Sequence, residues 1–422
     1  MQDSDKNAII FSFDSEISEI IDLVQSLDYK VIKSFIQKRK NPDVKTFMGK
    51  GKIDEILEYI EESELNFELI VINGELKPSQ WFILEKEFNI QVFDRVRLIL
   101  DIFKKRAERK EAKLQVKLAQ LQYERPYVRE LIHRAKSGEH PGLMAGGEYQ
   151  VDDYYEMIKK QMKKIKSDLN QITNERDLRR AHRHKGGFYL VSIAGYTNSG
   201  KSSLLNLLSD EKVKVEGKLF STLSTTTRKL KKTKHPILIT DTVGFIRNLP
   251  AWVIDAFHST LEEIELADVV ILVVDASEDQ NAVFEKMEVS IQELIDLGVN
   301  SQIIIAFNKI DKISQDKIKL LKEYLDNKGI LKEKSYVFIS VKKNLFIDNL
   351  IEKLIGSLPQ LIRYNIKIPI TNETQSIISW IYDKANVLNI NYSNNVEIEI
   401  ESSVSVREMI ISKSKDIELI NN

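Results

Sequence analysis

The chain has 422 residues, 42% hydrophobic and 30% charged, which is ordinary for a folded protein of about two to four domains. It has no cysteine, which excludes disulfide bonds and thiolate metal sites and suits a reducing cytoplasm. No hydrophobic run approaches the roughly 20 residues of a membrane-spanning helix, and the N-terminus lacks the pattern of a signal peptide. Residues 101–187 hold 21 lysines and arginines against 13 aspartates and glutamates, although the whole chain has a net charge of −1. This uneven distribution predicts a local anionic partner.

Residues 1–105 alternate short hydrophobic runs with amphipathic segments. The pattern predicts strands at 8–13, 29–35, 69–72 and 90–93, and helices at 16–24, 53–60 and 78–88. Such alternation is typical of a small parallel α/β domain. Gly49-Lys50-Gly51-Lys52 opens the second helix. It is as consistent with an ordinary turn at the start of a helix as with a phosphate site.

Residues 106–185 predict an antiparallel hairpin of two helices. Two sets of residues follow the 4-3 spacing of a heptad seam: Leu114, Leu118 and Leu121, then Ile158, Met162, Ile165, Leu169 and Ile172. The glycines and proline of the connector at 137–149 exclude one continuous helix. Pro126 should kink or end the first helix.

The second helix of this arm is strongly basic. Its charged residues include Lys159, Lys160, Lys163, Lys164, Lys166, Arg176, Arg179, Arg180, Arg183 and Lys185. Two interpretations stay open. The run is either a solvated helix face or a surface that contacts the backbone of a nucleic acid, which needs charge but little reading of bases.

Residues 186–358 begin with a phosphate-loop motif. The segment matches G-x-x-x-x-G-K-[ST] at every fixed position, between a predicted strand at 189–194 and a predicted helix. The residues expected to bind nucleotide here are Gly195, Tyr196, Thr197, Asn198, Ser199, Gly200, Lys201, Ser202 and Ser203. Backbone N–H groups of such a loop surround a phosphate, and the helix N-terminus adds partial positive charge. Lys201 should reach the β- and γ-phosphates, and the Ser202 hydroxyl should bind Mg²⁺.

Two further motifs follow predicted strands. Asp241, Thr242, Val243 and Gly244 form D-x-x-G after the strand at 237–240, where Asp241 would hold Mg²⁺ through water and the Gly244 N–H would sense a γ-phosphate. Asn308, Lys309, Ile310 and Asp311 form N-K-x-D after the strand at 303–307. The Asp311 carboxylate can accept two hydrogen bonds from guanine N1–H and N2–H, a donor pair that adenine lacks.

Ser340, Val341 and Lys342 follow a strand predicted at 336–339 and are placed to contact guanine O6. Three motifs in this order, each at a strand end, predict a guanine-nucleotide site. The fold expected is therefore α/β. A P-loop GTPase domain with a mostly parallel sheet and helices on both faces follows a small α/β domain and a helical hairpin.

The segment between Ser202 and Asp241 should contain the first switch. It contributes Phe220, Ser221, Thr222, Leu223 and Ser224 to the expected nucleotide site. Thr222 is the preferred Mg²⁺ ligand of this segment, with Thr226 as second choice. We expect the catalytic residues to be Lys201, Thr222 and Gly244.

Phe245 follows the D-x-x-G motif, where Ras-like proteins have a glutamine that orients the attacking water. A phenyl ring cannot do this, so hydrolysis is expected to be slow without a partner or an ion. Asn198 could hold K⁺ beside the phosphates. The alternative, a loop asparagine that caps its own backbone, is equally consistent with the sequence.

The C-terminal segment predicts a small α/β domain at 363–422. Residues 360–370, between Pro359 and Pro369, are predicted to be a linker. A helix is expected at 376–382, and strands at 387–392 and 396–400. No function is predicted for this domain.

Taken together, the motifs resemble those of the HflX family, in the Obg-HflX branch of translation-factor-like P-loop GTPases. The resemblance rests on the segments 46–52, 94–103, 113–123, 195–202, 241–247 and 249–263. The family's switch segment F-A-T-L-D-P-T corresponds to 220–226, which favours Thr222 as the Mg²⁺ ligand. The bacterial loop pattern G-x-G-P-G-E-T-Q is spaced differently at 141–150, so the partner contact of this loop is not carried over.

Members of that family bind the large ribosomal subunit and can separate stalled ribosomes. The resemblance therefore implies a monomeric, cytoplasmic GTPase that uses Mg²⁺ with GTP or GDP, with K⁺ as an open option. Its expected partners are the large ribosomal subunit and ribosomal RNA, with no membrane span. Two alternatives stay open: a GTPase of ribosome assembly or RNA modification, and an RNA-binding module in which nucleotide is only structural.

Overall fold

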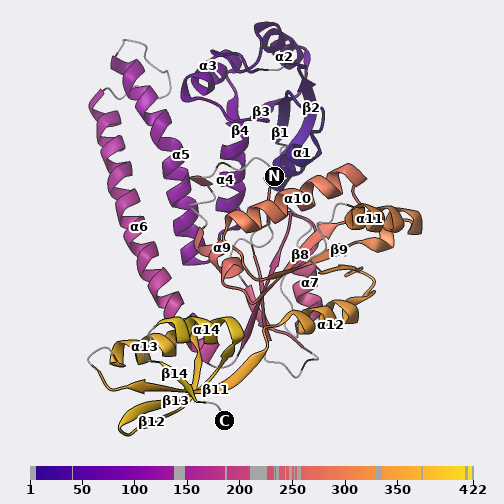
Figure 1. Ribbon diagram of the computed structural model, residues 1–422. Helices are drawn as coiled ribbons and strands as arrows, with labels where there is room; N and C mark the ends of the chain where they lie inside the picture. The colour runs from indigo at the N-terminus through magenta and orange to yellow at the C-terminus, as the bar shows by residue number, and fades with distance from the viewer. Residues whose placement is uncertain are drawn as a thin grey trace, which may run out of the picture. The chain divides into compact units, whose positions relative to one another are not determined.

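The structure, a computed structural model, describes residues 6–39, 41–136, 148–185, 188–209, 226–231, 233, 237–242, 244–246, 250, 252–253, 258–327, 335–371, 374–413 and 417–420. The chain divides into two compact units, the first containing Met1–Asn170 and the second most of the chain from Gln171 onward (Figure 1). Each unit is described by itself. Among the described residues, no helix is both long enough and apolar enough to cross a bilayer.

The N-terminal domain is built on a four-stranded parallel sheet in the order β2-β1-β3-β4. Its strands are β1 (Asn7–Ser12), β2 (Lys30–Ile36), β3 (Phe67–Ile72) and β4 (Gln91–Asp94). Its helices are α1 (Ser18–Ser26), α2 (Lys50–Glu62), α3 (Pro78–Phe88) and α4 (Arg95–Arg106). The predicted alternation of strands and helices is confirmed. It arises because two parallel strands that follow each other in the chain need a crossover connection, usually a helix.

The two faces of this sheet follow from the twofold alternation of side chains along each strand. Ile9, Phe11, Ile70 and Ile72 pack on one face in a cluster that includes Ile53 and Ile56 of α2 and Leu84 and Phe88 of α3. α1 and α4 contact each other, and α4 also contacts β3. Asp94 caps the N-terminus of α4 by accepting a hydrogen bond from Arg97 N, and burial raises the pKa of its carboxyl to about 6.

The helical arm consists of α5 (Lys110–Lys136) and α6 (Glu148–Lys185), which lie side by side in Figure 1. The predicted seam is confirmed except for Ile172, which is not part of the cluster. The cluster consists of Leu114, Leu118, Leu121, Val128, Ile132, Tyr155, Ile158, Met162, Ile165 and Leu169. Pro126 lies inside α5, so of the two predicted outcomes, a kink or the end of the first helix, the end does not occur. Leu121 and Val128 pack into the seam on either side of Pro126, and this packing offsets the backbone hydrogen bond that proline cannot make. The connector at 137–147 lies outside the described residues.

α5 also packs against the N-terminal domain. The Tyr127 hydroxyl donates a 3.1 Å hydrogen bond to the Leu76 carbonyl oxygen and lies 2.7 Å from the Tyr123 hydroxyl. The Tyr127 ring meets Trp81 of α3 edge to face, with 5.3 Å between centroids. These contacts join the first helix of the arm to the domain before it.

The nucleotide domain contains a six-stranded sheet in the order β10-β9-β8-β5-β7-β6. Its strands are β5 (Tyr189–Ala194), β6 (Thr226–Lys229), β7 (Ile237–Asp241), β8 (Val269–Asp275), β9 (Gln302–Asn308) and β10 (Ser335–Phe338). The helices and one 3₁₀ turn are α7 (Lys201–Leu208), α9 (His258–Glu265), α10 (Gln280–Asp296), η1 (Ile310–Lys312), α11 (Gln315–Asn327) and α12 (Ile347–Ser357). Only β6 among these strands runs antiparallel, and the expected α/β class is confirmed.

Helices cover both faces of this sheet (Figure 1). Leu204 of α7 and Leu350 of α12 pack with Ile193, Ile271 and other residues on one face. The alternate residues of β8 are also fully buried, and α10 packs against that strand. A strand buried on both faces has a continuous hydrophobic run, as residues 269–274 do.

The C-terminal domain is an antiparallel sheet with two helices, in the chain order β-α-β-β-α-β. Its elements are β11 (Leu361–Pro369), α13 (Thr374–Lys384), β12 (Asn386–Tyr392), β13 (Asn395–Ser403), α14 (Val404–Lys413) and β14 (Glu418–Ile420). The strand order β12-β13-β11-β14 gives a ferredoxin-like topology.

The prediction of a linker at 360–370 is wrong, because β11 is a central strand paired with β13 and β14. Tyr364, Ile366 and Ile368 are buried, whereas Arg363 and Lys367 alternate with them outside the core. The sequence contains this alternation with a period of two. The linker prediction gave more weight to the prolines at its ends. Pro369 is tolerated because it is the last residue of the strand.

Candidate nucleotide site

The phosphate loop joins the end of β5 to the start of α7, as predicted. Gly200 is the N-cap of α7 and has φ of +105°, a backbone conformation that other residues rarely adopt. A Cβ at Gly200 would lie 2.3 Å from Nδ2 of Asn308. The loop can therefore close against the N-K-x-D segment only with glycine at this position.

Lys201 is only 7% exposed, and its Nζ donates a 2.7 Å hydrogen bond to the Tyr196 carbonyl oxygen within the same loop. Burial lowers the pKa of Lys201 to about 8, although the Asp241 carboxylate partly opposes this shift. A buried ammonium at the start of a helix is arranged to receive a strongly anionic group.

Ser202 and Asp241 are brought together from two separate motifs. The Ser202 hydroxyl donates a 2.6 Å hydrogen bond to Oδ2 of Asp241, and Asp241 is fully buried. A hydroxyl oxygen beside a carboxylate is a donor set that suits Mg²⁺, which binds oxygen ligands and retains several waters. No cluster of three or more acidic, histidine or cysteine side chains that could hold a metal occurs among the described residues. Phosphate oxygens and water would therefore complete the coordination.

Gly244 and Phe245 run alongside the phosphate loop. A Cβ at Gly244 would lie 2.8 Å from Nζ of Lys201, which places the D-x-x-G glycine directly beside that ammonium. The backbone N–H of Phe245 donates to the Gly195 carbonyl oxygen at 3.0 Å, and its own carbonyl oxygen accepts from Thr197 N at 3.1 Å. Phe245 is 7% exposed, so its ring is buried in the protein.

Asn308 connects three loops at the base-binding end. Its Nδ2 donates to the Ser199 carbonyl oxygen at 2.9 Å, and its Oδ1 accepts from Val341 N at 3.1 Å. The Ser340 hydroxyl donates a 2.6 Å hydrogen bond to Oδ1 of Asp311. Three predicted segments that are far apart in sequence therefore meet at the carboxyl ends of β5, β9 and β10.

A cavity of about 640 Å³ lies at this edge of the sheet, within the range of small-molecule sites. The residues that line it are Asn198, Gly200, Ser203, Asn206, Leu207, Asn308, Lys309, Asp311, Lys312, Val341 and Lys342. Most of these were predicted from the motifs. Asn206, Leu207 and Lys312 were not predicted. They line the cavity because of the direction in which α7 and the turn after Asp311 run, and no motif specifies that direction.

Some predicted residues do not face the cavity. The Thr242 hydroxyl donates to the Ile193 carbonyl oxygen at 2.7 Å and is fully buried, and Ile310 is also buried. Thr226, the second choice for Mg²⁺, begins β6 opposite Asp241. Five switch residues and one D-x-x-G residue lie outside the described residues: Phe220, Ser221, Thr222, Leu223, Ser224 and Val243.

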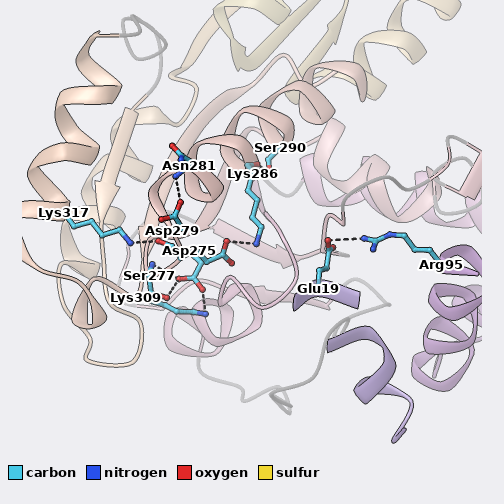
Figure 2. A network of polar contacts seen from close by, with 11 residues as sticks. Glu19, Arg95, Asp275, Ser277, Asp279, Asn281, Lys286, Ser290, Lys309 and Lys317 are labelled. Carbon is cyan, nitrogen blue, oxygen red and sulfur yellow. Dashed lines mark hydrogen bonds and ion pairs between the residues drawn. The ribbon is translucent and has the colours of Figure 1, made fainter. Parts of the chain in front are cut away.

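One charged residue of the site was missed altogether. Oδ2 of Asp275, at the end of β8, lies 2.5 Å from Nζ of Lys309. Figure 2 shows the two side chains directed toward each other. A signal was available in the sequence. Asp275 ends a buried strand next to the strand that delivers Asn308, and the ends of parallel neighbours meet at one edge.

In the N-terminal domain, the contacts around Gly49 are those of an ordinary helix start. Gly49 is the N-cap of α2, and its N–H donates to Oε1 of Gln37 at 3.1 Å. Lys52 forms an ion pair with Glu55 at 2.5 Å. The predicted phosphate alternative has no further support in these contacts.

A phosphate loop, a D-x-x-G glycine and an N-K-x-D segment at one edge of this sheet define a P-loop GTPase. Three family models match the chain. One described as the N-terminal part of a GTP-binding GTPase matches 14–104, one described as its middle region matches 106–183, and one described as a 50S ribosome-binding GTPase matches 190–309.

Curated relatives and a solved structure agree with this class. GTPase HflX of Thermococcus kodakarensis is 36% identical over 412 residues, which cover 96% of this chain and 92% of the relative. GTPase HflX of Methanocaldococcus jannaschii is 39% identical, covering 88% of this chain and 89% of the relative. A crystal structure of SsGBP with GDP is 29% identical with a TM-score of 0.51, covering 83% of this chain and 98% of that one. The chain belongs to the GTPase HflX family and is a GTP-hydrolysing enzyme.

Proposed function

We propose that this GTPase uses the site between β5, β9 and β10 as a switch that controls binding to the large ribosomal subunit, in ribosome splitting, rescue or translation under stress. The observation that supports the site most is that Asn308 and Asp311 line one cavity with Asn198 and Gly200 of the phosphate loop. The Ser340 hydroxyl joins them through its hydrogen bond to Asp311. The ribosomal partner is supported by the matching family model for a 50S ribosome-binding GTPase.

The proposed roles follow the geometry. Backbone N–H groups of 195–203 bind the phosphates, with Lys201 as the charged group, and Gly244 senses the γ-phosphate beside it. Ser202 binds Mg²⁺ directly and Asp241 binds it through water, as their paired oxygens suggest. Thr222 would close onto the same ion as part of 220–224. When bound, Mg²⁺ neutralises charge on the phosphates.

The base is proposed to bind between Asn308–Asp311 and Ser340–Lys342. Asp311 accepts hydrogen bonds from guanine N1–H and N2–H, and the Ser340 hydrogen bond helps to orient its carboxylate. Val341 and Lys342 line the same cavity, and this segment is the proposed contact for guanine O6.

Hydrolysis is proposed to need a partner or an ion. The buried ring of Phe245 offers no polar atom to an attacking water. Asn198 has φ of +63° and lines the cavity, so its side-chain oxygen is a candidate ligand for K⁺. If Asn198 holds K⁺, exchanging K⁺ for Na⁺ will slow turnover. Equal rates in the two salts would leave Asn198 as a structural loop residue.

The basic arm is the proposed contact for ribosomal RNA. Among the residues of α6 whose side chains the structure describes, five lysines are exposed: Lys159, Lys160, Lys163, Lys164 and Lys166. Phosphate backbone contacts depend on such charge, and their affinity falls as salt rises. Replacing Lys160 and Lys164 by glutamate should therefore weaken RNA binding and lower its salt dependence. The same change at Lys319 and Lys353, which are exposed in the nucleotide domain, is the control.

Cosedimentation with ribosomal subunits tests the proposed function. We expect the protein to pellet with intact large subunits with a GTP analogue and much less with GDP. Pelleting only with precursor particles would instead indicate ribosome assembly. Binding that is the same with both nucleotides, with hydrolysis unchanged by any partner, would contradict a switch.

The base assignment has its own test. Asp311→Asn should move the preference from guanine toward xanthine nucleotides, because the amide presents a donor where the carboxylate accepted. Unchanged affinity for GDP in this variant would contradict the assigned site. Titration with fluorescent GDP and XDP measures both values.

A further inference from the structure

Asp275 is held tightly at the end of β8. Its Oδ1 accepts two hydrogen bonds from Ser277, one from the backbone N at 2.9 Å and one from the hydroxyl at 2.6 Å. The sheet register places it beside Asn308, and the Ala276 N–H donates to the Asn308 carbonyl oxygen at 2.9 Å. Ser277 therefore fixes the carboxylate, while the hydrogen bond between Ala276 and Asn308 fixes the backbone beside it.

The partner of this carboxylate is Lys309 of the N-K-x-D segment. The two charged atoms lie 2.5 Å apart, and the side chains are only 21% and 11% exposed for Lys309 and Asp275. A partly buried ion pair loses less of its attraction to solvent than an exposed one. Lys309 also has φ of +65°, so its backbone is held in an uncommon conformation while its side chain lines the cavity.

A second carboxylate, that of Asp311, belongs to the same cavity lining as this lysine. Asp311 is two residues further along and is the one acidic side chain among the described residues lining the cavity. An ammonium on a flexible four-carbon stem can pair with either carboxylate. If Lys309 paired with Asp311, that carboxylate could no longer accept both hydrogen bonds from guanine.

We propose that Asp275 is a positioning residue for guanine recognition. It holds the Lys309 ammonium at the end of β8, so that the lysine stem lines the base site and the Asp311 carboxylate stays available to the base. Figure 2 shows the Lys309 side chain directed toward Asp275, with Ser277 beside Asp275. The inference rests on the proposed nucleotide site and adds a residue that acts on it only through Lys309.

The first test is Asp275→Asn in the full chain, with GDP and IDP as probes. IDP lacks the 2-amino group, so the ratio of the two affinities reports how well Asp311 reads guanine. We expect GDP affinity to fall about tenfold and the GDP-to-IDP ratio to fall with it, since a hydrogen bond to a charged group is lost. A merely structural loss would lower both affinities equally and leave the ratio unchanged, which would overturn the proposal.

The second test is a double-mutant cycle with Lys309→Met, which keeps an apolar stem and removes the charge. If Asp275 acts through Lys309, Asp275→Asn should cost about twofold or less in that background. A loss of about tenfold in both backgrounds would show that Asp275 acts by another route. Ser277→Ala offers a milder variant, expected to lower the same ratio by a smaller factor, should Asp275→Asn fold poorly.

Asp279→Asn is the matched control in the same loop. Asp279 caps α10 by accepting a hydrogen bond from Asn281 N. The control should therefore lower the melting temperature slightly and leave nucleotide affinity unchanged. The Asp311→Asn variant tests the nucleotide site separately from the role of Asp275. If it fails to change base preference, the site assignment is wrong, whereas a normal response there with additive effects at Asp275 and Lys309 overturns only this inference.

Discussion

The hydroxyl of Ser340 donates a 2.6 Å hydrogen bond to Oδ1 of Asp311, across two segments that are 29 residues apart in sequence. This hydrogen bond is the main cause that lowers the pKa of the Asp311 carboxyl below its ordinary value. The contact favours the ionised carboxylate and fixes one of its two oxygens. The residue proposed to select guanine is thus oriented from a neighbouring strand end.

Replacing Ser340 by alanine should therefore weaken GDP binding about fivefold, because Asp311 would lose the hydrogen bond that orients it. The variant also removes the acceptor that Lys343 N uses at 3.1 Å, so that turn should loosen. Ser335→Ala on β10 is the control, because the Ser335 hydroxyl contacts Lys353 and not the cavity. Equal GDP affinities for the wild type and Ser340→Ala, measured by fluorescence titration, would disprove the orienting role.

Gly244→Ala should abolish most GTP hydrolysis, by about 100-fold or more, while GDP binding changes little. The added Cβ would lie 2.8 Å from Nζ of Lys201 and 3.0 Å from Thr197 N, so the segment that senses the γ-phosphate would have to move away. Loss of one backbone donor to a developing charge commonly costs two to three orders of magnitude, on the order of 100- to 1,000-fold. Single-turnover hydrolysis and GDP titration together measure the effect.

Gly356→Ala is the contrasting glycine variant. Gly356 lies inside α12, and a Cβ there would meet nothing within 4 Å. The substitution should leave hydrolysis unchanged and stabilise the domain by about 0.5–1 kcal/mol, because alanine loses less entropy in a helix. A large loss of activity in this variant would mean that glycine substitutions act through folding rather than through the γ-phosphate.

Nucleotide binding should take up a proton near pH 8–9. Burial lowers the pKa of Lys201 to about 8 in the free protein, and the phosphates of a bound nucleotide raise it again. Affinity is therefore fullest below about pH 8 and falls as pH rises, since more free protein must then be protonated on binding. Calorimetry in buffers of different ionisation enthalpy measures the proton directly. Zero proton uptake at pH 8.5 would refute the lowered pKa.

The free protein should show the opposite trend in stability. A lysine with a lowered pKa in the folded state carries an unfavourable buried charge below about pH 8. The unfolded state binds more protons between that pH and about 10.5, so the contribution of Lys201 to stability rises over this range. Lys201→Met should remove this part of the pH dependence of the melting temperature.

The seam of the arm can be tested with two neighbouring residues. Ile158 is fully buried between α5 and α6, whereas Met157 is 42% exposed. Ile158→Ala should destabilise the hairpin by about 2–5 kcal/mol, and Met157→Ala should change its stability by about 0.5 kcal/mol or less. Hydrogen exchange of the amide groups in α5 and α6 reports both. Similar exchange in the two variants would contradict the packing of the seam.

The local patterns of the sequence determined most of the elements and the chemistry of the site. The helix expected at 78–88 has those bounds in the structure, and the heptad residues Ile158, Met162 and Ile165 pack as their spacing required. These features depend only on residues that are neighbours along the chain. Hydrophobic periods and the phosphate-loop, D-x-x-G and N-K-x-D motifs can therefore be recognised from the sequence alone.

Contacts between distant segments needed the tertiary structure. Pro126 does not end α5, because packing across the seam outweighs the local preference of proline. Residues 361–369 form a central strand and not a linker, since their two partners are β13 and β14. The pairing of Asp275 with Lys309 depends on the register of β8 against β9. Strand pairing and register are set by the packing of the whole sheet, so the sequence of one strand does not determine them.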